Sequence, residues 1–134
     1  MQITREMSKG QIVALSFYDD GITTAVVAMA IDALVLGVSA PFDGCLIAMS
    51  ANNNAASTHA TATETCYFTR NTTATAASVV LTYNTVSNYA TFARDAYRFV
   101  AGDVLGVKYS ATAGFGPNTI DGQCTLFVKF DIEV

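Results

Sequence analysis

Charged residues are scarce in this sequence. Of its 134 residues, 13% are charged and 51% are hydrophobic. A small protein that stays monomeric in water normally covers its surface with ionic side chains. The shortage therefore favours an oligomer or a subunit of a larger shell. The length matches one ordinary domain, so no second domain is needed.

Basic residues are few as well. The seven lysines and arginines are spread singly along the chain, and the formal net charge is −4. A protein that binds nucleic acid needs a stripe of basic side chains to neutralise phosphates. Nucleic acid is therefore not an expected partner.

Histidine and cysteine are too sparse for the usual catalytic and zinc sites. His59 is the only histidine, and no glycine elbow or suitably spaced carboxylate accompanies it. One histidine and scattered cysteines do not make a four-ligand zinc site. Cys45, Cys66 and Cys124 form no CxxC pair and are odd in number, which predicts reduced thiols in the core. We expect a protein that is not an enzyme and holds no cofactor, with His59 exposed on a loop.

Five aspartates lie at predicted turns, at positions 19, 20, 43, 103 and 121. Carboxylates gathered at one end of a domain can bind a calcium ion. Turns also select aspartate for its local backbone hydrogen bonds, which is the simpler explanation. A calcium site therefore stays open as an alternative.

No apolar run is long enough to span a membrane. Residues 24–38 are apolar, but the run is shorter than a membrane span and contains Asp32. The first six residues provide neither a basic leader nor an apolar run. We expect no membrane segment and a chain that remains in the cytosol in which it is made.

The clearest pattern lies in residues 123–134, where apolar and polar residues alternate. Such alternation predicts a strand with one buried face, formed by Cys124, Leu126, Val128, Phe130, Ile132 and Val134. Phe127 interrupts the opposite, polar face between Thr125 and Lys129. A large aromatic side chain there needs a cover, and a second copy of the subunit can provide it. We predict a subunit contact at Thr125, Phe127 and Lys129, with Tyr109 of the preceding strand as a neighbour.

Turn signals divide the rest of the chain into short segments. They are Asp19-Asp20-Gly21, Pro41-Phe42-Asp43-Gly44, Arg70-Asn71-Thr72, Gly102-Asp103 and the loop at 114–118. Seven to nine short strands with turns at regular intervals are typical of a β-sandwich or jelly roll. The predicted strands are 11–17, 22–27, 45–49, 65–69, 78–83, 97–101, 104–109 and 123–134.

Two segments are harder to assign. Residues 22–38 are so uniformly apolar that helical and strand patterns both match, although their β-branched residues favour strands with a break near Asp32. Residues 50–65 are rich in Ala, Asn, Ser and Thr. That composition predicts a long surface loop, with or without an edge strand, that contributes nothing to the core.

Three motifs resemble the tumour-necrosis-factor-like jelly rolls of tailed-phage structural proteins. They are Ala-Pro-Phe-Asp-Gly-Cys-Leu-Ile at 40–47, Tyr-Arg-Phe-Val-Ala-Gly-Asp-Val-Leu-Gly-Val at 97–107, and Phe-Asp-Ile-Glu-Val at 130–134. A strand pair around Arg70-Asn71 lies between the first two. The resemblance covers roughly residues 34–134 and consists largely of turn chemistry. It implies an all-β jelly-roll sandwich, assembled as a homotrimer.

The resemblance also implies a function. Such domains cement the outside of phage capsids as trimers, or form the heads of tail fibres that touch the host. The sequence contains no repeats of the kind that a fibre shaft would have, which favours the cement role. The expected partner is then the major capsid protein, the expected location is the virion exterior, and no small-molecule substrate is expected. A fibre head is the alternative, and a cellular carbohydrate-binding jelly roll is a more remote one.

The first ten residues mix charged and apolar side chains without a clear period. We expect residues 1–10 to form an arm, and residues 11–134 to form the single domain. An end segment becomes ordered only when something holds it. The predicted capsid-binding residues of the arm are Ile3, Arg5, Met7 and Lys9. The alternative is that the arm completes a sheet of its own or a neighbouring subunit.

Overall fold

The computed structural model describes residues 12–23, 29–31, 37–112 and 119–132. The predicted all-β class is confirmed, because these residues form ten strands and no helix. The strands are β1 (Val13–Thr23), β2 (Met29–Ile31), β3 (Val38–Ser39), β4 (Gly44–Asn53), β5 (Glu64–Arg70), β6 (Thr73–Leu81), β7 (Ser87–Thr91), β8 (Arg98–Phe99), β9 (Val104–Ala111) and β10 (Thr119–Phe130).

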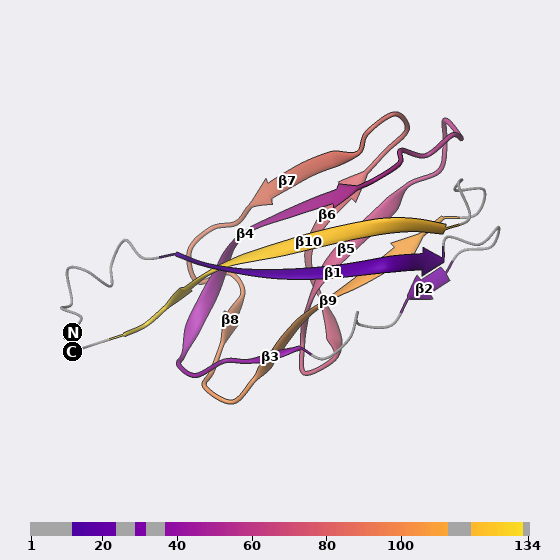
Figure 1. The fold of residues 1–134 in the computed structure, drawn as a ribbon. Helices are drawn as coiled ribbons and strands as arrows, with labels where there is room; N and C mark the ends of the chain where they lie inside the picture. Colours follow the sequence, from indigo (N-terminus) through magenta and orange to yellow (C-terminus); the bar gives the residue numbers. More distant parts are fainter. Residues whose placement is uncertain (1–11, 24–28, 32–36, 113–118, 133–134) are drawn as a thin grey trace.

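The strands form two antiparallel sheets packed as a sandwich (Figure 1). Sheet A has the order β1-β10-β4-β7, and β8 also pairs with β4. Sheet B has the order β2-β9-β5-β6, and β3 also pairs with β9. The pairing is nested along the chain, since β1 pairs with β10, β2 with β9, β4 with β7 and β5 with β6. Strands distant in sequence are thereby brought side by side.

The core lies between the sheets and takes alternate residues from each. Both β4 and β10 are inner strands of sheet A, while β5 and β9 are inner strands of sheet B. Their buried side chains include Leu46, Met49, Phe68, Leu105, Val107, Tyr109 and Leu126. The predicted alternation is confirmed for Cys124, Leu126 and Val128, which are fully buried. The strand ends at Phe130, earlier than predicted, Phe130 and Ile132 are half-buried, and Val134 lies outside the described residues.

The predicted hairpin at Asp19-Asp20-Gly21 is wrong. β1 continues through these residues and stays paired with β10. The register shifts between Asp19 and Ile22, where β1 has one more residue than β10 has between Gly122 and Ile120. A β-bulge absorbs such an extra residue without ending the strand. Pairing along the whole of β10 thus overrides the local turn preference of Asp-Asp-Gly.

The predicted surface loop at 50–65 is partly wrong. β4 extends to Asn53 and β5 begins at Glu64, so only the residues between them form the connection. Ala51 and Ala62 are buried in the core, and Glu64 is only 1% exposed. Small side chains such as alanine fill narrow places between the sheets. The mostly polar composition of residues 50–65 gave no sign of these individual buried positions.

Of the ambiguous segment 22–38, the described residues include the short strands β2 and β3, in line with the preference for strands. The predicted loop at 114–118 lies outside the described residues. The turn at 41–44 is confirmed, because the backbone bends at Pro41 and Phe42 before β4 begins.

The predicted turn at Arg70-Asn71-Thr72 is confirmed as the tight hairpin between β5 and β6. Its two turn residues, Asn71 and Thr72, have positive φ angles of 53° and 69°. A two-residue hairpin loop with both angles positive matches the twist of the flanking strands. Asn71 also connects this hairpin to β9, because its Oδ1 accepts a hydrogen bond from the Val104 amide at 2.8 Å.

Thr72 is strained in this turn, since a β-branched residue rarely adopts a positive φ. We expect Thr72→Gly to raise the free energy of unfolding by about 1 kcal/mol, because glycine adopts this angle without a steric cost. Urea unfolding measures the change. Thr73→Gly is the matched control on the next residue, which is in a strand, and it should lower stability. A Thr72→Gly protein no more stable than the original would contradict the prediction.

Candidate functional site

The outer face of sheet A is nearly free of charge. We call this surface the sheet A face. Among the described residues its charged members are Lys129 and, where β8 pairs with β4, Arg98; the other side chains of this face are small, polar or aromatic. Register and alternation place on it Ala14, Ser16, Tyr18, Ala48, Ser50, Asn52, Ser87, Tyr89, Thr91, Gln123, Thr125, Phe127 and Lys129.

Phe127 lies in the middle of the sheet A face. It pairs with Ala14 of β1 on one side and with Ala48 of β4 on the other. Because both neighbours are alanines, no long side chain covers the ring from the adjacent strands, and Phe127 remains half-buried. The buried residues Leu126 and Val128 on either side confirm that the ring points outward.

Thr125 and Lys129 share this outward orientation with Phe127. Thr125 is 9% exposed, and its hydroxyl lies 2.9 Å from the Ser16 hydroxyl of β1. Lys129, two residues after Phe127 in β10, is half-buried. The structure therefore brings together three of the four residues of the predicted subunit contact, and their role in such a contact stays a prediction.

The predicted position of Tyr109 beside Phe127 is wrong. Tyr109 belongs to β9 in sheet B, and it is fully buried between the sheets. Phe127 points away from that space on the outside of sheet A. Adjacent strands in the sequence of a sandwich often belong to different sheets, so proximity along the chain did not give proximity in space. Tyr109 is a core residue and has no surface to offer a second subunit.

The predicted capsid-binding residues Ile3, Arg5, Met7 and Lys9 lie outside the described residues, as does the whole of segment 1–10. The predicted boundary at residue 11 lies there as well.

Several charged residues gather at one end of the sandwich. Arg98 forms ion pairs with Asp95, at 2.6 Å, and with Asp131. These contacts, with that to Asp131 the largest, raise the pKa of Arg98 and keep it charged. Asp43 accepts a hydrogen bond from the Ala101 amide at 2.8 Å. The charges at this end thus tie turns from different parts of the chain together.

Asp103 belongs to the same end. Its carboxylate accepts hydrogen bonds from the Val100 amide and the Asn71 side chain, both at 2.9 Å. These two bonds lower the pKa of Asp103. Gly102, in the same turn, has a φ of 93°, as the predicted Gly-Asp turn requires. The described residues contain no group of three or more His, Cys, Asp or Glu side chains placed to hold a metal ion.

A buried polar cluster was not predicted from the sequence. Glu64 lies between the sheets, where the Asn53 side-chain amide donates a hydrogen bond to its Oε2. Its other oxygen, Oε1, is buried without a hydrogen-bond partner in the described part of the chain. Burial raises the pKa of Glu64 to about 7, and the Asn53 bond opposes this only partly. The sequence signal was its spacing, because Glu64 shares the alternating phase of Cys66 and Phe68.

The three cysteines are free and buried, as predicted. Cys66 pairs with Tyr109 across β5 and β9, close to Glu64. Burial, followed by contact with Cys124, raises the pKa of the Cys66 thiol well above its ordinary value. Burial also raises the pKa of the Tyr109 hydroxyl. The Cys66 thiol therefore stays protonated and behaves as a core side chain.

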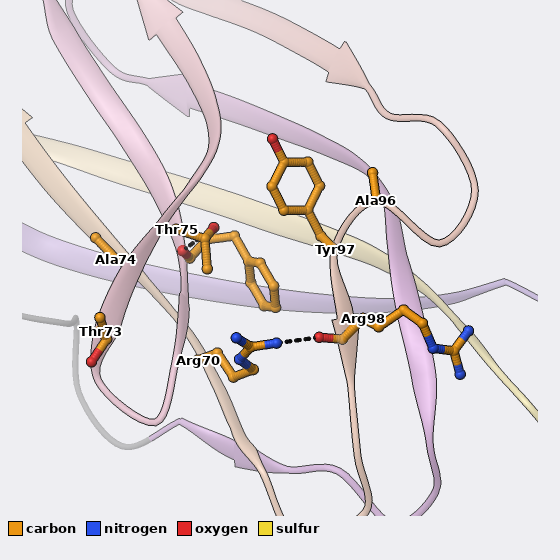
Figure 2. A pocket seen from close by; sticks show the side chains of 8 residues that line it. Arg70, Thr73, Ala74, Thr75, Ala96, Tyr97 and Arg98 are labelled. Atoms are coloured by element: carbon orange, nitrogen blue, oxygen red, sulfur yellow. Dashed lines mark hydrogen bonds between the residues drawn. The ribbon is translucent and has the colours of Figure 1, made fainter.

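A pocket of about 300 Å³ opens between the sheets at the end where the β5–β6 hairpin faces the segment that leads into β8 (Figure 2). Sheet B contributes Phe68, Arg70, Thr73, Ala74 and Thr75, and the opposite side contributes Ala96, Tyr97 and Arg98. Arg70 reaches across, and its Nη1 donates a hydrogen bond to the Arg98 carbonyl at 2.5 Å. Sequence reasoning missed this pocket because its two walls come from different sheets.

His59 is exposed on the β4–β5 connection, as predicted. Its backbone amide donates a hydrogen bond to the Ser57 hydroxyl at 3.2 Å, so the contact is part of a local turn. Among the described residues, no helix is both long and apolar enough to cross a membrane.

Neither family models nor curated proteins identify a relative of this chain. No protein-family model matches it. No curated protein is significantly similar to it either.

Proposed function

We propose that this protein is a tumour-necrosis-factor-like jelly roll that assembles as a trimer and decorates a phage capsid without catalysing a reaction. The observation that carries the proposal is the sheet A face, with the half-buried, outward-pointing Phe127 between two alanines at its centre. The trimeric state and the viral role in this proposal come from the resemblance of residues 34–134 to phage jelly rolls.

The nested strand pairing supports the jelly-roll part of the proposal. A jelly roll arranges eight strands in two sheets with two Greek-key connections. Here β1 pairs with β10, β2 with β9, β4 with β7, and β5 with β6. Each pair therefore lies inside the preceding pair along the chain, and the β5–β6 hairpin is the innermost. The short strands β3 and β8 extend the sheets at their ends.

The composition of the sheet A face supports assembly. A surface that remains in water usually carries charged side chains, and the centre of a subunit contact is depleted of them. Around Phe127 the sheet A face is uncharged apart from Lys129, and its other charged residue in the described part of the chain, Arg98, lies at the end where it pairs with Asp95 and Asp131. In a closed ring of three subunits, each subunit contacts the other two. Such a ring would cover Phe127 in every subunit and leave no contact surface open for further copies.

The capsid part of the proposal rests on the resemblance and on the N-terminal segment. An arm that becomes ordered on docking loses part of its contact energy to entropy. Three equivalent arms on one trimer recover affinity, because binding of the first raises the effective concentration of the others.

Removal of residues 1–10 tests this role. We expect the full chain to sediment as a trimer at micromolar concentration and to bind undecorated capsids. The shortened chain should keep the trimer mass and the melting temperature nearly unchanged but lose capsid binding, because only the arm contacts the shell. Co-sedimentation with undecorated capsids measures the binding.

Two results would count against the arm. If the shortened chain melts at a much lower temperature or loses the trimer mass, residues 1–10 complete a sheet. If it still binds capsids, the loops make the contact. Mass spectrometry of purified virions separates the capsid role from the fibre-head alternative, since hundreds of copies fit a capsid protein and a few copies fit a fibre tip.

The pocket beside Arg70 is the observation that favours the alternative, a trimeric receptor-binding head of a tail fibre. A fibre head has to contact a molecule on the host surface, and a pocket open to solvent gives it a place to do so.

A further inference from the structure

We propose that the pocket between Arg70 and Tyr97 binds a carboxylate-bearing sugar, such as a uronic or sialic acid. This binding site is independent of the sheet A face and of any role on a capsid. It lies between the two sheets at one end of the sandwich, and its volume of about 300 Å³ is at the lower limit of small-ligand pockets.

Arg70 supplies the charge that selects an anion. It lies on the same alternating phase of β5 as Phe68, so it extends between the sheets where the core ends. Its hydrogen bond to the Arg98 carbonyl fixes the guanidinium across the pocket, as Figure 2 shows. A guanidinium has five N–H donors in a rigid plane, and that single bond leaves the others to form a paired contact with a carboxylate.

The charge of Arg70 is not cancelled inside the pocket. None of the residues that line it is acidic. The second arginine, Arg98, turns its guanidinium away from Arg70 towards its partners Asp95 and Asp131 (Figure 2). The Asp103 carboxylate attracts Arg70 electrostatically, but it is hydrogen-bonded to Val100 and Asn71 and does not line the pocket. One positive charge therefore faces the pocket, which suits a carboxylate with a single negative charge.

The remaining lining suits a sugar ring. Tyr97 is held edge-on against Phe92, with ring centroids 5.2 Å apart, and provides an aromatic surface. Phe68 adds a second, buried aromatic group. Thr73 and Thr75 bring hydroxyl groups; that of Thr75 donates to the Phe68 carbonyl at 2.8 Å and accepts from the Ala77 amide at 3.3 Å, which leaves it one lone pair for a ligand. Aromatic surface, hydroxyls and one guanidinium together match a ring that carries hydroxyls and one carboxylate.

Titration with N-acetylneuraminic acid and with glucuronic acid, followed by amide NMR shifts of the full chain, tests the proposal. At least one of the two acids should shift signals from residues 68–75 and 96–98, while glucose and inorganic phosphate should not. Arg70→Gln should weaken binding of that acid by about tenfold or more, as expected for hydrogen bonds to a charged group. Arg70→Lys should weaken it less, because the charge remains but the paired geometry is lost.

Arg94→Gln is the matched control, since it removes one exposed arginine near the same end that does not line the pocket. It should leave the affinity unchanged. The proposal is overturned if neither acid binds, if glucose or phosphate binds equally well, or if Arg70→Gln and Arg70→Lys both bind like the original chain. A failure of these titrations leaves trimer mass and capsid binding unaffected, so it is distinguishable from failure of the proposed function.

Discussion

Phe127→Asp is expected to convert the trimer into folded monomers. The half-buried ring lies at the centre of the sheet A face, between Ala14 and Ala48. An aspartate there would bury a carboxylate without a partner at each subunit contact, at a cost of about 3 kcal/mol or more. That weakens each contact by roughly a hundredfold or more. Sedimentation velocity at micromolar concentration should show the mass of one subunit.

The protomer itself should tolerate this change. Phe127 points away from the core, so circular dichroism should still show a folded β protein. Val80→Asp is the matched control, because Val80 is an apolar residue of β6, 39% exposed, whose buried neighbours Val79 and Leu81 place it on the outside of sheet B. It should leave the trimer mass unchanged. A Phe127→Asp protein that remains trimeric would show that the sheet A face is not the subunit contact.

Glu64→Gln is expected to remove most of the pH dependence of stability between pH 4.5 and pH 7. Burial raises the pKa of Glu64 from 4.5 to about 7 in the folded state, so the folded chain holds a proton that the unfolded chain has released. The resulting stability is fully present below pH 4.5 and is lost as the pH rises towards 7. The original chain should therefore be less stable at pH 8 than at pH 5.5 by about 2 kcal/mol.

Glutamine stays neutral throughout this range and has nearly the same shape. At pH 8, Glu64→Gln should raise the free energy of unfolding by about 3 kcal/mol, because no charge then has to be buried. Urea unfolding at one fixed protein concentration measures both effects, since association also stabilises the folded state.

Asp103→Asn is the control, because folding lowers the pKa of Asp103 whereas it raises the pKa of Glu64. Hydrogen bonds lower the pKa of Asp103, so its contribution is lost only as the pH falls below the ordinary range for aspartate. This variant should leave the dependence between pH 5.5 and pH 8 unchanged. An original chain that is equally stable at both pH values would refute the assignment to Glu64.

The sequence by itself determined the all-β class, the outward orientation of Phe127 and the hairpin at Asn71-Thr72. Each of these depends on local physics. Alternating residues must point to opposite faces of a strand, and Asn71 accepts the positive φ that a two-residue turn needs, whereas Thr72 adopts it only with strain. For the same reason, the burial of Cys124, Leu126 and Val128 followed directly from their spacing along β10.

Only the tertiary structure decided where distant strands meet. The turn predicted at Asp19-Asp20-Gly21 is a bulge because pairing with β10 continues past it. Tyr109 is remote from Phe127 because β9 and β10 belong to different sheets. Glu64 meets Asn53, and Arg70 meets the Arg98 carbonyl, only after the sheets have stacked. These contacts depend on the order of strands across the sheets, and the spacing of residues along one strand carries no information about that order.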